Sequence, residues 1–379
     1  MIYFDNAASS FYKPYLCTER AVYAMRELSV NAGRSGHKLS EQAERLIYSA
    51  RSTTSSAFNN GSVQRVIFTA NCTQALNFAI FGIERKKRKI VTTVTEHNSV
   101  LRPLYQLEKS GYKLVIAKLN EKRCICADDV INLVDDDTAF VAVNAVSNVT
   151  GAKNEYEKIG INLKGSGIPF IVDGAQAAGH VRIDMRSSNI NCLAVAGHKG
   201  LNSIQGAGAL IFDENVEISP IIFGGSGNET FEKVPSCYPE KLEAGTRDLP
   251  AISSFEQGVK SSAENITERG NRLIKLTAAL IRGLDSIYGV KTYSVPNPFG
   301  ICAFEISAFP SVDAARVYSE LFSIAVRGGF HCAPLMHEAL KTDENGLIRA
   351  SLSTYNTAEE VNDFLTATEY LAKHADKLL

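Results

Sequence analysis

Short apolar segments rich in β-branched or aromatic residues alternate with helical patterns along the first half of the chain. The apolar segments are residues 66–69, 90–94, 139–146 and 168–172. Polar turn residues bound each of them, which is typical of strands buried on both faces of a parallel sheet. The helical patterns between them are residues 75–82, 100–110 and 128–134. This alternation predicts an α/β domain with a mainly parallel mixed sheet between helices and right-handed crossovers.

The pattern changes near residue 250. Beyond this point we expect a long helical stretch over residues 253–288, then a smaller mixed region with segments at 301–306 and 312–322, and a final helix from Thr357. A chain of 379 residues is long enough for two linked domains. We therefore predict an N-terminal segment (1–15) that packs with the small domain, a large domain (16–250) and a smaller α+β C-terminal domain (251–379).

The composition is that of an ordinary globular protein, with 45% hydrophobic and 21% charged residues. A formal net charge of -1 argues against nucleic acid as a partner. No apolar run reaches the length of a membrane span, and the first residues carry no basic and apolar leader. The eight cysteines show no paired Cys-x-x-Cys spacing, so we expect no metal site and a cytoplasmic protein with reduced thiols.

An aspartate and a lysine stand out near the end of the predicted sheet. Asp173 ends a buried strand in Ile-Val-Asp-Gly-Ala-Gln, and Lys199 lies in the glycine-flanked turn Ala-Gly-His-Lys-Gly. A pyridoxal phosphate (PLP) site needs such a pair, because the lysine forms a Schiff base with the cofactor aldehyde and the carboxylate keeps the pyridine nitrogen protonated. Alone, a lysine is usually a solvated charge and Asp-Gly a turn. With Gln176 and His198 beside them, the pair predicts a PLP site.

Polar clusters also follow three other predicted strands, at residues 69–73, 95–99 and 147–151. Ligands of open α/β sheets bind at the carboxyl ends of strands, so one shared site is plausible. The amides near Cys72 and the Thr73 hydroxyl suit a phosphate, although a plain helix N-cap would explain them too. His97 suits stacking on a flat ring and proton transfer, or a structural role. Asn148 offers an amide side chain, or simply a turn.

Two residues of the second domain offer further chemistry. Cys332 lies in a short glycine-rich turn, Arg-Gly-Gly-Phe-His-Cys-Ala-Pro, that begins at Arg327. A nearby cation would favour its reactive thiolate, although a lone cysteine is more often an inert core residue. Arg349 lies in an apolar segment and suits bidentate binding of a carboxylate, or a surface ion pair of little energetic weight.

Together these motifs resemble the class V aminotransferase superfamily of fold-type I PLP enzymes. More closely, they resemble the cysteine desulfurase and selenocysteine lyase family (NifS/SufS-like). The resemblance runs from residues 3–8 to residues 349–357 and includes residues 31–37 and 243–246. The form Arg-x-Gly-x-His-Cys-Ala, here residues 327–333, is similar to the branch in which the cysteine sits on a short loop.

The resemblance implies a role for each candidate residue. The implied cofactor-binding residues are Lys199, Asp173, Gln176, His97, Asn148, Cys72, Thr73, His198 and Thr246. The implied substrate-binding residues are Arg349, Asn148 and Arg327, and the implied catalytic residues are Lys199, Cys332 and His97. Thr246 would reach the phosphate of the neighbouring subunit, which implies a homodimer with shared active sites. Ala196 stands where this family commonly has serine, so one phosphate contact is missing or replaced.

The implied function is a PLP-dependent cysteine desulfurase. L-Cysteine would become L-alanine, Lys199 would take the Cα proton, and the sulfur would pass to Cys332 as a persulfide for a sulfur-acceptor protein. Three alternatives stay open. They are a lyase that prefers L-selenocysteine, a class V aminotransferase or lyase acting on another amino acid with Cys332 incidental, and a non-enzymatic protein that keeps the fold.

Overall fold

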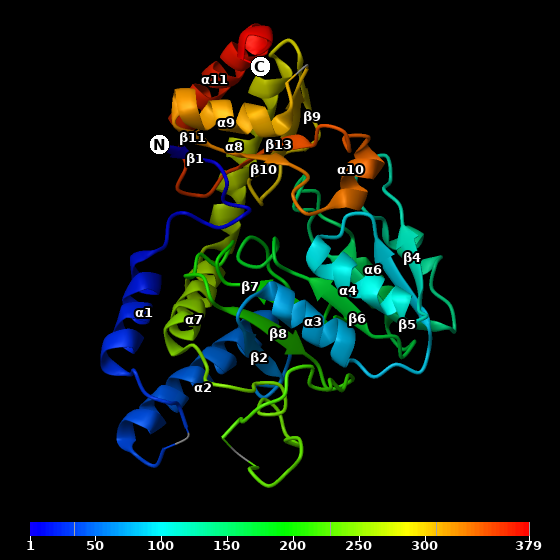
Figure 1. Cartoon of the computed structure of the whole chain (residues 1–379), viewed down its shortest axis with the longest axis vertical. Helices are drawn as coiled ribbons and strands as arrows, with labels where there is room; N and C mark the ends of the chain where they lie inside the picture. The colour runs from blue at the N-terminus through cyan, green and yellow to red at the C-terminus, as the bar shows by residue number, and fades with distance from the viewer. Residues whose placement is uncertain (34, 228, 308, 379) are drawn as a thin grey trace.

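The computed structural model describes residues 1–33, 35–227, 229–307 and 309–378. Arg34, within the motif at residues 31–37, lies outside the described residues. The chain forms a larger part around a seven-stranded sheet and a smaller part around a four-stranded sheet (Figure 1). None of the helices within the described ranges combines the length and the apolar character needed to span a bilayer.

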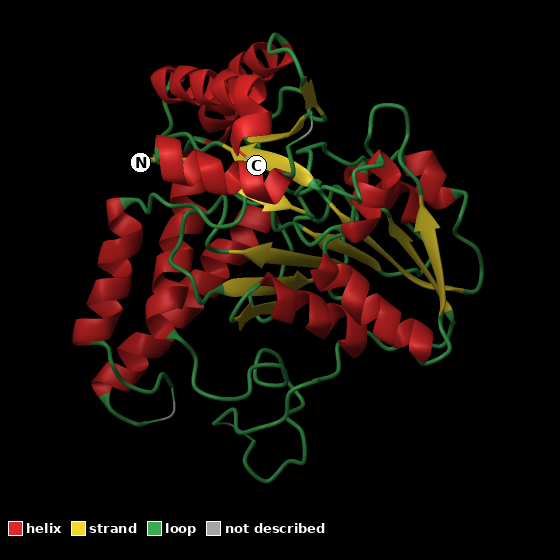
Figure 2. Cartoon of the chain, turned by 45° about the horizontal axis from the view of Figure 1, so that its top comes forward, coloured by secondary structure: helices red, strands yellow, loops and turns green. Residues whose placement is uncertain are grey.

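The larger part contains most of the helices and the long sheet. Its elements are α1 (Tyr15–Glu27), α2 (Lys38–Phe58), β2 (Val66–Thr69), α3 (Cys72–Gly82), β3 (Lys89–Thr93), α4 (Asn98–Lys109), β4 (Lys113–Ala117), α5 (Ala127–Ile131), β5 (Thr138–Asn144), α6 (Tyr156–Leu163), β6 (Phe170–Asp173), β7 (Cys192–Ala196), β8 (Gly208–Phe212) and α7 (Leu249–Glu264). Helices lie on both sides of the strands (Figure 2).

The seven strands follow the order β2-β8-β7-β6-β5-β3-β4. β8 runs antiparallel to both of its neighbours, and all other pairs next to each other in the sheet are parallel. Six strands therefore end at one edge of the sheet, and β8 begins there. This confirms the predicted α/β fold with a mainly parallel mixed sheet. β4 was not predicted, because its partly exposed residues do not form a continuous buried run.

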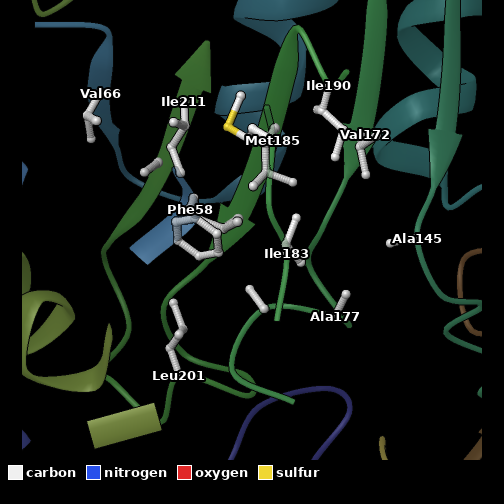
Figure 3. Packing of buried hydrophobic residues seen from close by; sticks show 14 of the residues in the cluster. Phe58, Val66, Ala145, Val172, Ala177, Ile183, Met185, Ile190, Leu201 and Ile211 are labelled. Atoms are coloured by element: carbon white, nitrogen blue, oxygen red, sulfur yellow. The ribbon is translucent and has the colours of Figure 1, made fainter. Parts of the chain in front are cut away.

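Alternate residues of the central strands enter two hydrophobic cores, one on each face of the sheet. Val172 and Leu193 lie in the core that α2 and α7 cover, whereas Ile171 and Ala194 lie in the core that α3 and α4 cover. Figure 3 shows the first core, where Phe58 of α2 lies among strand and loop side chains such as Ile211. Burial on both faces explains why these strands appear in the sequence as unbroken apolar runs.

The smaller part has its own core. Its elements are β1 (Ile2–Tyr3), α8 (Ile266–Asp285), β9 (Val290–Thr292), β10 (Ile301–Ile306), α9 (Ser311–Phe322), β11 (Ile324–Ala325), β12 (Arg327–Gly329), α10 (Pro334–Leu340), β13 (Leu347–Ser351) and α11 (Ala358–Leu378). The order β12-β13-β10-β9 forms an antiparallel sheet. In the mixed region, the segment at residues 301–306 forms strand β10, and the segment at 312–322 lies in helix α9.

The prediction of one helical stretch over residues 253–288 is wrong. Two helices, α7 and α8, meet at Asn265, whose φ of -128° and ψ of 25° are not helical. Asparagine competes for backbone hydrogen bonds and disfavours helix interiors, but a single such residue hardly changes the hydrophobic pattern. Phe255 of α7 packs in the core of the large sheet, whereas Leu273 of α8 packs in the core of the smaller part. The domain boundary near residue 250 stays a prediction.

The first residues of the chain lie against the smaller part (Figure 1). β1 pairs in parallel with β11, and Phe4 is fully buried in the core of the smaller part. Beyond Phe4 the chain crosses to the larger part, where the amide of Ser10 donates to the carbonyl oxygen of His198 at 2.9 Å. We call residues 4–13 the N-terminal strap. The strap connects the two parts of the molecule beside the turn that carries Lys199.

We predict that Gly208→Ala destabilises the fold. A Cβ atom at Gly208 would lie 2.7 Å from the carbonyl carbon of Asn71, 2.8 Å from the Val195 oxygen and 2.9 Å from the Cys72 nitrogen. These are backbone atoms, so the start of α3 or the end of β7 must move. We expect a loss of about 1–3 kcal/mol in the free energy of unfolding, measured by denaturant titration. Gly36→Ala is the control, because nothing lies within 4 Å of the added Cβ there. Equal stability of the two variants would contradict the prediction.

Candidate active site

The parallel pair β6 and β7 brings Asp173 and the Lys199 turn to the same edge of the sheet. Asp173 ends β6 and pairs with Ala194 of β7, and Lys199 follows the end of β7 at Ala196. The turn is tightly closed, because the amide of Asn202 donates to the Lys199 carbonyl oxygen at 2.9 Å. The aspartate and the lysine, separated in sequence, therefore face one region at the strand ends.

Burial opposes the charges of this pair. Burial raises the pKa of Asp173, against the lowering effects of the Ala175 amide and of Lys199. Burial lowers the pKa of Lys199, against the attraction of Asp173. The Asp173 carboxylate accepts from the Ala175 amide at 2.9 Å and from the Cys72 thiol at 3.6 Å. A protonated ring nitrogen beside this carboxylate would supply a cationic partner, which makes the pair suited to PLP.

The start of α3 offers an anion site next to this pair. The side chain of Asn71 caps the helix by accepting from the Gln74 amide at 3.0 Å. The amides of Cys72 and Thr73 make no hydrogen bond to another described residue. The His198 Nδ1 atom is also buried without a partner. Two unpaired amides at a helix N-terminus and an unpaired imidazole nitrogen suit a phosphate group.

Ala196 and Gly208 shape the same corner. Ala196 is 2% exposed and pairs with Gly208 of β8. Its methyl group joins the hydrophobic core on the α3 side of the sheet and offers no hydroxyl to a ligand. Gly208 lets β8 pass close to the backbone of Cys72. A phosphate at the start of α3 would therefore be held mainly by backbone amides.

His97 is the N-cap of α4 and keeps a neutral side chain. Its Nδ1 atom accepts from the Ser99 amide at 3.0 Å, which places the ring proton on Nε2. Burial, together with the positive charges of neighbours such as Lys199 and Arg327, lowers the pKa of His97 to about 4. The imidazole therefore offers an Nε2–H donor at neutral pH rather than a second cation.

Gln176 and Asn148 each keep part of their hydrogen-bonding capacity free. Gln176 donates from Nε2 to the carbonyl oxygen of Ala7 at 2.9 Å. Asn148 donates from Nδ2 to the carbonyl oxygen of His331 at 2.7 Å, but its Oδ1 atom is buried without a partner. A buried amide oxygen with no donor is costly unless a ligand supplies one. Asn148 therefore marks a place for a donor group of a cofactor or substrate.

Cys332 lies on a short loop that reaches the large sheet. Only residues 330–333 separate β12 from α10. His331 and Cys332 both have a positive φ, 50° and 56°, a conformation that costs energy for residues other than glycine and is often found at functional sites. The Cys332 carbonyl oxygen accepts from the Asn98 amide at 2.7 Å. Arg327 donates from Nη2 to the half-buried thiol of Cys332 at 3.7 Å.

Arg349 lies on β13 and is 1% exposed. Its Nη1 donates to the carbonyl oxygen of Asn148 at 2.9 Å, and its Nη2 donates to Asp5 Oδ1 at 3.0 Å. Its Nε is buried and has no partner. The smaller part thus contributes a thiol and a guanidinium to the strand ends of the larger part.

Thr246 lies apart from the residues above. It is exposed, on the loop before α7, and lines a surface pocket with Ala70, Gln74 and Gly206. The adjacent Arg247 anchors this loop through an ion pair with Glu44 at 2.6 Å. The role implied for Thr246 belongs to a neighbouring subunit and stays a prediction.

Sequence reasoning missed the residues of the N-terminal strap that touch the site. Asp5 holds Arg349, and Ser10 donates to the carbonyl oxygen of His198 from both its amide and its hydroxyl, at 2.9 and 3.0 Å. Asp5 lies within the family motif at residues 3–8, but the sequence alone does not indicate its contact with Arg349. No local pattern around Asp5 indicates a partner more than three hundred residues away.

Glu96 was also missed. It is fully buried, directly before His97, and its Oε1 accepts from the Thr93 hydroxyl at 2.6 Å and from the Asn144 amide at 2.9 Å. Its Oε2 has no partner. Burial raises the pKa of Glu96 to about 8, and the negative charge of Asp173 adds to this effect. Glu96 is therefore mostly a neutral acid at pH 7.

The fold is that of the fold-type I class of α/β enzymes. The family model described as aminotransferase class-V matches residues 2–364. A probable cysteine desulfurase of Pyrococcus abyssi is 32% identical over 394 residues, covering 98% of this chain and 94% of that protein. A probable cysteine desulfurase of Methanothermobacter thermautotrophicus is 30% identical, covering 95% of this chain and 92% of that protein. The chain belongs to the class V aminotransferase family, as its motifs indicated.

Solved structures show the same similarity. The apo structure of a cysteine desulfurase from Thermococcus onnurineus NA1 matches with a TM-score of 0.88 and 30% identity, covering 98% of this chain and 94% of that chain. A NifS-like protein matches with a TM-score of 0.86 at 24% identity, covering 98% of this chain and 99% of that chain, and this second match concerns the fold alone. The whole described architecture therefore has solved counterparts.

We predict that Glu96→Gln changes how stability depends on pH. Folding raises the pKa of Glu96 from 4.5 to about 8, so between these values the folded state binds more protons than the unfolded state. The contribution of Glu96 to stability therefore falls as the pH rises, with a slope of up to about 1.4 kcal/mol per pH unit. Glutamine mimics the neutral acid and has no proton to lose.

The free energy of unfolding of Glu96→Gln relative to the wild type should therefore increase between about pH 5 and pH 8. Denaturant titrations across this range measure the difference. The exposed Glu19 provides a control, since Glu19→Gln should show no such trend. A difference for Glu96→Gln that stays constant with pH would show that its carboxyl group is ionised throughout.

Proposed function

We propose that this chain is a PLP-dependent cysteine desulfurase, which converts L-cysteine to L-alanine and takes up the sulfur on Cys332 as a persulfide. The observation that carries the proposal is the position of the Cys332 thiol. Its loop is bonded to the start of α4 and to Asn148, and Arg327 lies 3.7 Å from its sulfur. The similarity to proteins named probable cysteine desulfurases supports it.

Residues of the larger part would hold the cofactor. Asp173 would pair with its ring nitrogen, and Gln176 with its ring oxygen. His97 would lie against the ring beside Asn148. The phosphate would be bound by Cys72, Thr73 and His198. Bound there, PLP supplies an electron-accepting ring for a substrate carbanion. The unpaired amides at the start of α3 and the unpaired Asn148 and His198 atoms support this placement.

Arg349 would bind and orient the substrate. A guanidinium binds a carboxylate with two parallel hydrogen bonds, and Arg349 keeps donors free for this purpose. Arg327 and the Asn148 side chain would lie on the same side of the substrate. Fixing the carboxylate fixes the direction of the Cα–H bond, which the proton transfer requires.

Lys199 and His97 would handle protons. Lys199 would take the Cα proton, and burial favours its neutral amine, the form that accepts a proton. The Cys332 thiolate would attack the substrate sulfur, so that an S–S bond forms while the substrate C–S bond breaks. Arg327, whose Nη2 lies 3.7 Å from the sulfur, would face the attacking group. The neutral His97, with its proton on Nε2, is the candidate group for moving the thiol proton.

We also propose a cytoplasmic homodimer that passes its sulfur to an acceptor protein. All eight cysteines are free, which fits a reducing compartment. Thr246 is exposed on a loop of the larger part, where it would be available to the phosphate of a second copy. The half-buried thiol of Cys332 leaves the persulfide within reach of an acceptor.

Incubation with L-cysteine, with alanine and sulfide measured with and without a reductant, tests the proposed activity. We expect both products, with turnover accelerated by the reductant because it removes sulfur from Cys332. A strong preference for L-selenocysteine would instead indicate a selenocysteine lyase. Amino-group transfer to pyruvate without sulfide release would indicate an aminotransferase. Absence of PLP from the purified protein would indicate a non-enzymatic role.

We predict that Cys332→Ala abolishes sulfide release from L-cysteine but keeps the yellow absorbance of bound cofactor. The thiol takes part only in sulfur transfer, and the residues proposed to hold the cofactor lie mainly on the larger part. The exposed Cys237 provides a matched control, and Cys237→Ala should retain normal sulfide release. Normal release by Cys332→Ala would refute the role of this thiol.

We predict that Lys199→Ala loses covalent attachment of the cofactor. After borohydride reduction, the wild type should gain the mass of one cofactor at Lys199, and the variant should gain none. Lys164→Ala, at an exposed lysine, should behave like the wild type. A labelled lysine other than Lys199 in the wild-type peptide map would disprove this assignment.

A further inference from the structure

We propose that Asp5 is a positioning residue, which holds the guanidinium of Arg349 so that its remaining donors are presented to the α-carboxylate of the substrate. The proposal rests on the proposed function in one respect, the binding of an amino-acid carboxylate by Arg349. It assigns a role at the site to the N-terminal strap. Asp5 Oδ1 and Arg349 Nη2 lie 3.0 Å apart, and the Arg349 side chain is 1% exposed.

The donors of Arg349 are divided between structure and ligand. A guanidinium has five N–H donors. One donates to Asp5 and one to the carbonyl oxygen of Asn148, from different terminal nitrogens. The Nε–H stays buried without a partner. The Nε–H and a second proton on a terminal nitrogen form the planar fork that a carboxylate binds with two hydrogen bonds.

The charges around Arg349 require a counter-ion. The positive charge of Arg327 acts on Arg349, and both act on Lys199. Asp5 forms an ion pair with Arg349, and burial lowers the pKa of Arg349 while the negative charge of Asp5 opposes this effect. Without Asp5, a buried guanidinium would face other cations with no anion bonded to it. A buried charge without its partner is strongly unfavourable, so the side chain would shift towards water.

The backbone fixes Asp5 in register with Arg349. Asp5 forms a parallel bridge with Ser351, two residues beyond Arg349 on β13. On either side of Asp5, the Phe4 carbonyl oxygen accepts from the Ser351 amide at 2.6 Å, and the Ala7 amide donates to the Ser351 hydroxyl at 2.9 Å. The two charged side chains therefore extend from backbones that are bonded to each other. This backbone pairing fixes the positions of both side chains, and a residue that orients a substrate must be held in a fixed position.

Asp5 binds Arg349 in a different way from the one expected for a substrate carboxylate. Its Oδ1 accepts one hydrogen bond, from Nη2 alone, and Nε is left without an acceptor. A carboxylate in the substrate position would take the free fork of Arg349 and satisfy Nε. The Asp5 side chain is also 22% exposed, at the margin of the buried guanidinium. This geometry favours positioning over competition with the substrate.

Asp5→Asn tests the proposal in the PLP-loaded enzyme, because it keeps the size of the side chain and removes its charge. Two probes separate carboxylate binding from amine binding: L-alanine, which carries the carboxylate, and ethylamine, which lacks it. Changes in cofactor absorbance measure the binding of each. Tyr3→Phe is the matched control. It removes hydroxyl bonds to the Asp5 and Ser9 carbonyl oxygens, at 3.3 and 3.1 Å, and leaves Arg349 untouched.

We expect Asp5→Asn to weaken L-alanine binding about tenfold or more, the loss of one charge-assisted contact, and to leave ethylamine binding unchanged. The KM for L-cysteine should rise by a similar factor, and kcat should fall less. Tyr3→Phe should change neither probe. Asp5→Ala should show the same selectivity with a larger effect.

Three results would overturn the proposal. Equal weakening of both probes, or failure of both Asp5 variants to fold, would indicate a purely structural role. Unchanged binding of L-alanine would show that Asp5 does not matter for Arg349. Tighter binding of L-alanine would show that Asp5 competes with the substrate. These outcomes do not depend on sulfide release, so a wild type that binds L-alanine but releases no sulfide would count against the desulfurase function alone.

Discussion

An aspartate and a lysine at the same buried edge of the sheet constrain much of this structure. Asp173 and Lys199 follow the adjacent parallel strands β6 and β7, and burying both requires compensating contacts. The carboxylate obtains them from the Ala175 amide and the Cys72 thiol. Since Cys72 begins α3, the helix must start beside the carboxylate, and the close approach of β8 then requires glycine at 208.

The second constraint is that the site needs both parts of the molecule. The larger part supplies the aspartate, the lysine and the anion site, but the guanidinium and the thiol come from β13 and the loop after β12. Asn148 connects the two parts of the molecule. Its carbonyl oxygen accepts a hydrogen bond from Arg349, and its side-chain amide donates one to the carbonyl oxygen of His331. A substrate bound by Arg349, as proposed, would therefore lie at the junction, where its reacting atoms could face Lys199 and Cys332.

The sequence predicts the central strands and the strand-end residues well, for one physical reason. Strands buried on both faces leave continuous apolar runs, and parallel strands bring their ends together, so polar residues after such runs can be placed on one edge. Features that depend on tertiary contacts leave no such trace. Asn265 interrupts the helix between α7 and α8 within one residue. Complete burial is what raises the pKa of Glu96. Asp5 reaches Arg349 because β13 lies beside it in the fold.

The distribution of charge connects these features. Burial keeps His97 neutral, and the positive charges of Lys199, Arg327, Arg349 and Arg102 add to this effect. A cationic histidine would add another positive charge to the site. Neutral His97 instead carries its single ring proton on Nε2, where it can donate a hydrogen bond. Asp5 forms an ion pair with Arg349, and the negative charge of Asp173 raises the pKa of Lys199 against the effect of burial, so each of these two groups has an anion of the chain itself acting on it.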